Sequence, residues 1–139
     1  MATFTSDSVE DTIGFARELA PTLAPNDIIA LAGELGAGKT HFVKGLLLGL
    51  GSSEEATSPT FTLVHEYRGG RLLLFHFDFY RLRERAELEE IGFDDYLDDD
   101  AITVIEWADR FPQVLPARTR WFRFQTLGES RRLISEERR

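Results

Sequence analysis

The sequence predicts one α/β domain, residues 1–139, with a mixed, mainly parallel sheet flanked by helices and a C-terminal β-hairpin. Three observations support this prediction. Residues 27–32 and 101–105 are short, nearly all-apolar runs, as expected of parallel strands that are buried on both faces. A helical pattern follows the first run. Residues 120–126 alternate in polarity, which is typical of a strand beside a hairpin.

The N-terminal part is predicted to form a helix. Ser8 and Asp11 form the pattern of a capping box, in which a hydroxyl and a carboxylate cover the first free amides. Apolar residues at helical spacing follow from residue 9 to residue 20. Pro21 and Pro25 are expected to end this helix within about a turn.

The middle of the chain is predicted to form a helix and then a hairpin. The pattern at residues 41–50 favours a helix, which residues 51–53 close. Residues 61–67 and 71–80 are predicted to pair across a tight turn at the two glycines between them. A short helix is expected at residues 84–90.

Residues 120–126 are predicted to pair with residues 132–135 across Gly128. No internal repeat or linker interrupts the chain.

Composition narrows the function classes. The chain has a net charge of −8, whereas a direct nucleic-acid binder usually carries a basic face, so any contact with RNA is expected to run through a partner. Cysteine is absent, which excludes disulfides and thiolate metal sites and fits a cytoplasmic protein. Neither a secretory signal nor an apolar run of about eighteen residues occurs, so no membrane span is expected.

Residues 33–40 read Gly-Glu-Leu-Gly-Ala-Gly-Lys-Thr, which is the phosphate-binding pattern Gly-x-x-x-x-Gly-Lys-Thr. Its glycines let successive N–H groups point at phosphate oxygens, and the following helix adds its positive end. Lys39 is expected to reach the β- and γ-phosphates, and the Thr40 hydroxyl to bind Mg²⁺. The sequence therefore predicts a P-loop NTPase-like domain that uses ATP and Mg²⁺, with nucleotide contacts from Glu34, Leu35, Gly36, Ala37, Gly38, Lys39, Thr40 and His41.

Two acidic residues at strand ends are candidate metal ligands or catalytic groups. Asp78 ends the apolar run 72–78, and Glu106 follows residues 102–105. Ligands lie at the carboxyl ends of strands in open α/β sheets, so either carboxylate could hold Mg²⁺, and Glu106 could instead position the attacking water. A turn-forming role for Asp78 and a solvated strand end for Glu106 stay open. His76 is interpreted first as a packed or hydrogen-bonded strand residue.

A loop at residues 58–61 follows the phosphate-binding helix and carries hydroxyl residues. Such a loop can sense the γ-phosphate and Mg²⁺ as a switch, but an ordinary Ser-Pro turn is equally compatible with the pattern. A guanine-specific Asn-Lys-x-Asp segment is absent, which disfavours a GTPase.

The phosphate-binding segment and four further segments together resemble the bacterial TsaE (YjeE) family. These segments are Thr-Ser-Pro-Thr-Phe-Thr-Leu-Val at 57–64, His-Phe-Asp-Phe-Tyr-Arg-Leu at 76–82, Glu-Glu-Ile-Gly-Phe at 89–93 and Val-Ile-Glu-Trp at 104–107. The resemblance runs from near the N-terminus to about Trp107, and the part from Phe111 onward matches less distinctively.

The resemblance implies an ATPase that takes part in threonylcarbamoyladenosine formation in tRNA, at the adenosine beside the anticodon. It implies a two-subunit threonylcarbamoyltransferase (TsaB and TsaD-like) as partner, weak hydrolysis alone, stimulation by that partner, and tRNA contact through the complex. The implied catalytic residues are Lys39, Asp78 and Glu106, and the implied metal ligands are Thr40, Asp78 and Glu106. The resemblance also implies Thr60 in the switch and Thr12 and Trp107 near the nucleotide.

Two other functions are compatible with the residues. A small-molecule kinase shares the phosphate-binding loop, and Arg81, Arg83 and Arg85 are its candidates for a lid over the phosphates. The second is a nucleotide sensor that docks to a partner without hydrolysing the nucleotide. The acidic stretch 84–100 is either a docking surface for a basic partner or a solvated helix and loop, and residues 98–100 favour the second reading.

Overall fold

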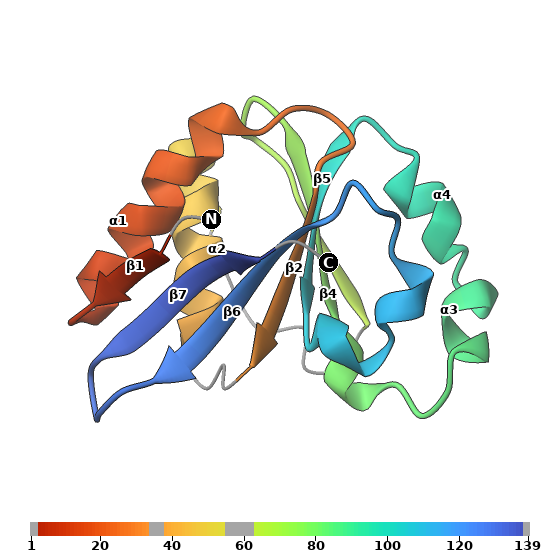
Figure 1. Ribbon diagram of the computed structural model, residues 1–139. Helices are drawn as coiled ribbons and strands as arrows, with labels where there is room; N and C mark the ends of the chain where they lie inside the picture. Colours follow the sequence, from red (N-terminus) through yellow and green to blue (C-terminus); the bar gives the residue numbers. More distant parts are fainter. Residues whose placement is uncertain (1–2, 34–37, 55–62, 138–139) are drawn as a thin grey trace.

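In the computed structural model, which describes residues 3–33, 38–54 and 63–137, the strands form one sheet in the order β1-β7-β6-β2-β5-β4-β3 (Figure 1). The four central strands, β6, β2, β5 and β4, pair in parallel, whereas the outer pairs β1–β7, β7–β6 and β4–β3 are antiparallel. This arrangement confirms the predicted mixed sheet and its C-terminal hairpin. The strands are β1 (Thr3–Ser6), β2 (Ile28–Gly33), β3 (Val64–Tyr67), β4 (Leu73–Asp78), β5 (Ala101–Glu106), β6 (Arg120–Thr126) and β7 (Arg132–Glu137).

Helices lie on both faces of the sheet. In Figure 1, α1 and α2 lie on one side of the central strands, and α3 and α4 lie on the other. Among the described residues, no helix is long and apolar enough to cross a membrane. The α-helices are α1 (Val9–Leu19), α2 (Gly38–Gly49), α3 (Ala86–Glu90) and α4 (Phe93–Leu97), and the 3-10 turns are η1 (Ala20–Thr22), η2 (Phe79–Arg81), η3 (Ala108–Arg110) and η4 (Pro112–Val114).

The start of α1 has the predicted side-chain cap. The Ser8 hydroxyl accepts a hydrogen bond from the Asp11 amide at 3.1 Å. The Asp11 carboxylate accepts from the amide of Asp7, one residue before the cap residue, at 2.9 Å. Both polar groups therefore satisfy backbone amides at this end of the helix, as the capping pattern indicated.

Helices α1 and α2 pack unusually closely through two glycines of α2. A Cβ atom added at Gly45 would lie 2.3 Å from the carbonyl oxygen of Ile13, and one at Gly49 would lie 2.5 Å from that of Arg17. Real Cβ atoms do not approach a backbone oxygen so closely, so both positions need glycine for space. The contact fixes α2 against α1 and thereby places the first turn of α2, where the phosphate-binding segment ends.

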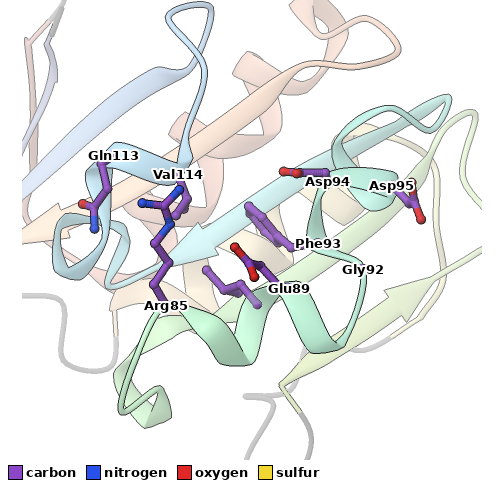
Figure 2. Close-up of a pocket in the computed structure, with 9 residues that line it drawn as sticks. Arg85, Glu89, Gly92, Phe93, Asp94, Asp95, Gln113 and Val114 are labelled. Carbon is purple, nitrogen blue, oxygen red and sulfur yellow. The ribbon is translucent and has the colours of Figure 1, made fainter.

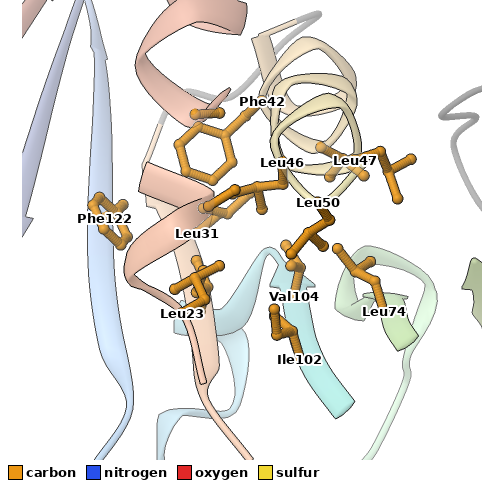
Figure 3. Close-up of a cluster of buried hydrophobic side chains, with 14 of the residues drawn as sticks. Leu23, Leu31, Phe42, Leu46, Leu47, Leu50, Leu74, Ile102, Val104 and Phe122 are labelled. Carbon is orange, nitrogen blue, oxygen red and sulfur yellow. The ribbon is translucent and has the colours of Figure 1, made fainter. Parts of the chain in front are cut away.

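Each face of the sheet carries its own apolar core. Figure 3 shows the core under α1 and α2, where Phe42, Leu46 and Leu47 of α2 meet side chains from the central strands. The opposite core is rich in aromatic rings, with Phe77 packed edge-on against Phe93 at 5.0 Å between ring centroids. Two buried faces explain why β2 and β5 are apolar at almost every position.

Three local features differ from the prediction. Strand β1 was not predicted. After α3, a second short helix, α4, forms at residues 93–97, where the sequence predicted no helix. Gly92 separates the two helices and has a left-handed conformation (φ 73°). The predicted strand to residue 80 is wrong beyond Asp78, because the Asp78 carboxylate accepts from the Tyr80 amide and starts η2. The other predicted hairpin strand is observed at Val64–Tyr67, and residues 61 and 62 lie outside the described ranges.

Candidate functional site

The carboxyl ends of three parallel strands bring the predicted acidic residues together. Asp78, the last residue of β4, pairs in register with Glu106, the last residue of β5. Glu106 in turn pairs with Leu31 of β2, two residues before Gly33, where the phosphate-binding segment begins. The two candidate carboxylates and the start of that segment therefore lie at the same edge of the sheet.

Alternation along the strands sets the face on which these side chains lie. Leu74 of β4 and Val104 of β5 belong to the core under α1 and α2. His76, Asp78 and Glu106 have the same parity as these residues and therefore point to the same side of the sheet. Helix α2 covers this side, so both acids lie on the same face of the sheet as the helix whose first turn carries Thr40.

Asp78 has a structural role in addition to its position. Its Oδ1 atom accepts a hydrogen bond from the Tyr80 amide at 2.9 Å, and the residue is only 8% exposed. The turn-forming role left open by the sequence is therefore present, and it fixes the orientation of the carboxylate at the strand end.

Glu106 is 1% exposed, so the alternative of a solvated strand end is wrong. Its Oε1 atom lies 2.9 Å from Nε2 of His76, which is completely buried. The two atoms are close enough for an ion pair, although the contact lacks the geometry of a hydrogen bond. His76 is thus packed, as expected, but the sequence did not indicate its contact with Glu106.

Gly33 and Gly38 of the phosphate-binding segment differ in whether the surrounding protein requires glycine there. Gly33 has a φ of 92°, and a Cβ atom there would lie 2.4 Å from the carbonyl oxygen of Phe124, so both conformation and space require glycine. At Gly38, a Cβ atom would make only ordinary contact with the Phe124 ring, at 3.8 Å. Packing within the described protein therefore does not explain Gly38, whereas close approach of a ligand to the backbone would.

A pocket of about 220 Å³ lies beside Gly38 on the α1 side of the sheet edge. It brings together Thr12 and His41, two of the residues predicted to contact nucleotide. Thr12 is 3% exposed, and its hydroxyl lies 2.7 Å from that of Ser6. The sequence did not identify the other lining residues, which come from the start of α1 and from the β6–β7 hairpin: Ser8, Val9, Glu129, Ser130 and Arg132.

Trp107 lies on the other side of the site and does not line that pocket. It adopts a left-handed conformation (φ 57°) directly after Glu106, and its ring lies 5.1 Å from that of Tyr80. Arg110 donates hydrogen bonds to the carbonyl oxygens of Phe79, at 3.0 Å, and of Tyr80. These contacts join the turns that follow the two acidic strand ends.

The remaining predicted residues are only partly described. Glu34, Leu35, Gly36, Ala37 and Thr60 lie outside the described ranges, as does the side chain of Lys39. Thr40 is half-buried in the first turn of α2.

Within the described ranges, no group of three or more His, Cys, Asp or Glu side chains is arranged to hold a metal. The carboxylates of Asp78 and Glu106 and the hydroxyl of Thr40 carry oxygen atoms, the type of ligand that Mg²⁺ prefers together with phosphate oxygens and water.

Two further cavities lie on the opposite face of the sheet. One of about 290 Å³ lies between α3, α4 and η4, and Figure 2 shows the carboxylates of Glu89, Asp94 and Asp95 around it with Arg85 nearby. An adjoining cavity of about 400 Å³ shares Asp94. Neither contains a residue predicted to bind nucleotide or Mg²⁺ in the ATPase interpretation. Their linings carry more acidic than basic residues and would repel phosphates, so the sheet edge beside α2 is the better candidate for nucleotide.

Known proteins are similar to this chain over most of its length. The family model described as "Threonylcarbamoyl adenosine biosynthesis protein TsaE" matches residues 6–134. A tRNA threonylcarbamoyladenosine biosynthesis protein TsaE of Treponema pallidum is 41% identical over 94% of this chain and 96% of its own length. The protein of that name from Bacillus subtilis is 37% identical over 91% of this chain and 78% of its own.

A solved structure has the same fold. The crystal structure of Bacillus subtilis YdiB superimposes with a TM-score of 0.79 and 32% sequence identity, covering 97% of this chain and 83% of that chain. The similarity extends beyond the phosphate-binding segment to nearly the whole of the present chain.

Proposed function

The chain belongs to the TsaE family, and on that basis we propose that it is an Mg²⁺-dependent ATPase required for threonylcarbamoyladenosine formation in tRNA beside the anticodon. The observation that carries the ATPase assignment is the in-register pair of buried acids, Asp78 and Glu106, on the side of the sheet from which α2 begins. We further propose that residues 1–139 act as one ATP-binding domain, because all described strands belong to one sheet.

The phosphates would be bound by backbone amides of residues 34–38 and by the positive end of α2. Lys39 would contact the β- and γ-phosphates, where negative charge develops as the terminal phosphate leaves. At Gly38, no close contact with the described residues explains the lack of a side chain, and this supports the placement.

Thr40, Asp78 and Glu106 would hold Mg²⁺, directly or through water. Mg²⁺ held there would neutralise part of the negative charge of the bound phosphates. The Tyr80 amide orients the carboxylate of Asp78, and the carboxylate of Glu106 is buried beside His76. Such preorganised groups favour the transition state because they need little rearrangement during the reaction. Thr60 would belong to the switch that senses the terminal phosphate.

The adenosine part of ATP would occupy the pocket lined by Thr12 and His41. This pocket adjoins Gly38 on the β6–β7 side, whereas the two acids lie on the β5–β4 side. A nucleotide that crosses the start of α2 would thus place its base at one end and its terminal phosphate at the other. Trp107 would lie near the terminal phosphate and away from the base.

The partner would be a two-subunit threonylcarbamoyltransferase with TsaB and TsaD-like subunits, and tRNA would be reached through that complex in the cytoplasm. The net charge of −8 supports indirect contact, because direct RNA binding gains most of its affinity from cationic contacts to phosphates. Weak hydrolysis by the isolated protein and stimulation by the transferase pair follow from such a partner-dependent cycle.

One observation counts against the kinase alternative. Arg85, one of three arginines considered for a lid, lines the acidic cavity on the opposite face of the sheet. Transfer of labelled phosphate from ATP to a nucleoside or sugar would nevertheless revive that function. Tight ATP binding without any product would indicate the non-hydrolysing sensor instead.

The proposal is tested by steady-state phosphate release from Mg²⁺–ATP, measured for the protein alone and then with cognate transferase subunits and tRNA. A slow basal rate that rises with the complete set supports both the ATPase and its pathway. A rate that the partners leave unchanged contradicts the pathway assignment, and the absence of release under every condition contradicts the ATPase itself.

A further inference from the structure

His76 occupies a position in β4 where an apolar side chain would be expected. Its neighbours in the strand, Phe75 and Phe77, are 2% and 0% exposed, and His76 itself is 0% exposed. Burying a polar ring without good partners costs free energy. Its Nδ1 atom has no hydrogen-bond partner among the described residues, so a histidine here needs a reason other than packing.

The imidazole lies between two side chains on neighbouring strands. Tyr67 of β3 stacks on it from one side, with 6.4 Å between ring centroids and an interplanar angle of 28°. On the other side, Nε2 lies 2.9 Å from Oε1 of Glu106 in β5. His76, Tyr67 and Glu106 all lie on the face that α1 and α2 cover, and all three are at least nine-tenths buried.

We propose that His76 is a positioning residue for Glu106. Its imidazole ring, which packs against Tyr67, lies beside one carboxylate oxygen of Glu106 and restricts the rotation of this carboxylate. This inference rests on the proposed ATPase function. A glutamate has three side-chain torsions, and a carboxylate that rotates freely contributes less to catalysis than one held in place. Because Asp78 already has the Tyr80 amide, His76 would give the second acid a comparable support.

The spacing His76-x-Asp78 gives this arrangement a simple geometric basis. Residues two apart in a strand share a face, and the parallel register puts Glu106 beside Asp78 and diagonal to His76. One strand therefore supplies both a candidate metal ligand and the group that orients the ligand on the next strand.

The test compares two replacements of His76. His76→Phe keeps the flat ring that stacks on Tyr67 but removes Nε2, and His76→Gln places an amide nitrogen near the position of Nε2. We expect His76→Phe to lower partner-stimulated turnover about tenfold or more, the usual cost of losing a group that orients a ligand, with ATP affinity retained. His76→Gln should recover most of this loss. Glu66→Gln is the control, because Glu66 is exposed on β3 and alternates to the face opposite Tyr67, and it should change turnover by about twofold at most.

A double-mutant cycle with Glu106→Gln separates positioning from a general structural effect. If His76 acts through Glu106, His76→Phe should lower turnover by less than about twofold once Glu106 is already glutamine. The free energy of unfolding in urea is measured for the same four proteins without nucleotide, and this measurement does not depend on activity. The loss of unfolding free energy in the double variant should differ from the sum of the losses in the two single variants.

The outcomes distinguish this inference from the proposed function. An active wild-type protein whose turnover is unchanged by His76→Phe overturns the inference alone, as do additive losses in both the kinetic and the unfolding cycle. A wild-type protein that releases no phosphate under any partner condition overturns the proposed ATPase, and the inference with it. A loss in His76→Phe, its recovery in His76→Gln and non-additivity in both cycles support the inference.

Discussion

Asp78 and Glu106 end neighbouring parallel strands in register, and they are 8% and 1% exposed on the same face of the sheet. Two ionised carboxylates at one strand edge would repel each other, and a divalent cation bound there would offset this repulsion. The arrangement is therefore suited to binding a cation.

Replacing Lys39 with alanine should weaken ATP binding roughly 10- to 100-fold, because a hydrogen bond between two charged groups is lost. Isothermal titration of Mg²⁺–ATP measures this change. Lys44→Ala is the matched control, since Lys44 is an exposed lysine farther along the same helix. Equal affinities for the two variants would contradict the role of Lys39.

Glu106→Gln and Glu106→Ala should lower turnover about 100-fold or more, as for the loss of other preorganised electrostatic groups, while ATP binding is largely retained. Phosphate release at saturating ATP and titration of ATP binding measure the two effects separately. Glu90→Gln, an exposed change on α3, serves as the control. If turnover survives in both Glu106 variants, this residue has no catalytic or metal-binding role.

Filling the pocket beside Thr12 should weaken binding of the base without weakening binding of the phosphates. Ser130→Trp places a large side chain at the mouth of this pocket and should weaken ATP binding about tenfold, or ~1.4 kcal/mol, while tripolyphosphate binds as before. Leu127→Trp is the control, because Leu127 is exposed in the same hairpin and does not line the pocket. Parallel losses for ATP and tripolyphosphate would place the base elsewhere.

Gly45→Ala should destabilise the protein although alanine favours helices. Higher helix propensity contributes about 1 kcal/mol, but the new Cβ meets a backbone oxygen at 2.3 Å, and overpacking costs about 1–3 kcal/mol. Thermal unfolding should show a midpoint lower by several degrees. Gly14→Ala on α1 meets nothing within 4 Å and should instead stabilise slightly, so opposite signs for the two variants confirm the close contact of the helices.

Local patterns were sufficient for most of the fold. The apolar runs at 27–32 and 101–105 predicted β2 and β5 because strands buried on both faces need apolar residues throughout. Strand β1 was missed because its four residues carry no strong pattern, and pairing with β7 holds it at the sheet edge. Helix α4 was missed because its sequence is acidic, and burial of Phe93 and Leu97 supports it.

The sequence alone determined the family, the phosphate-binding segment and the two acidic strand ends, because each depends on residues close together in the chain. Only the tertiary structure decided which distant groups meet. Strand order put His76 beside Glu106, and the β6–β7 hairpin brought Arg132 to the pocket that Thr12 lines. Such contacts depend on the register and order of the strands. Pairing across the whole sheet decides both, and a local sequence pattern does not contain that information.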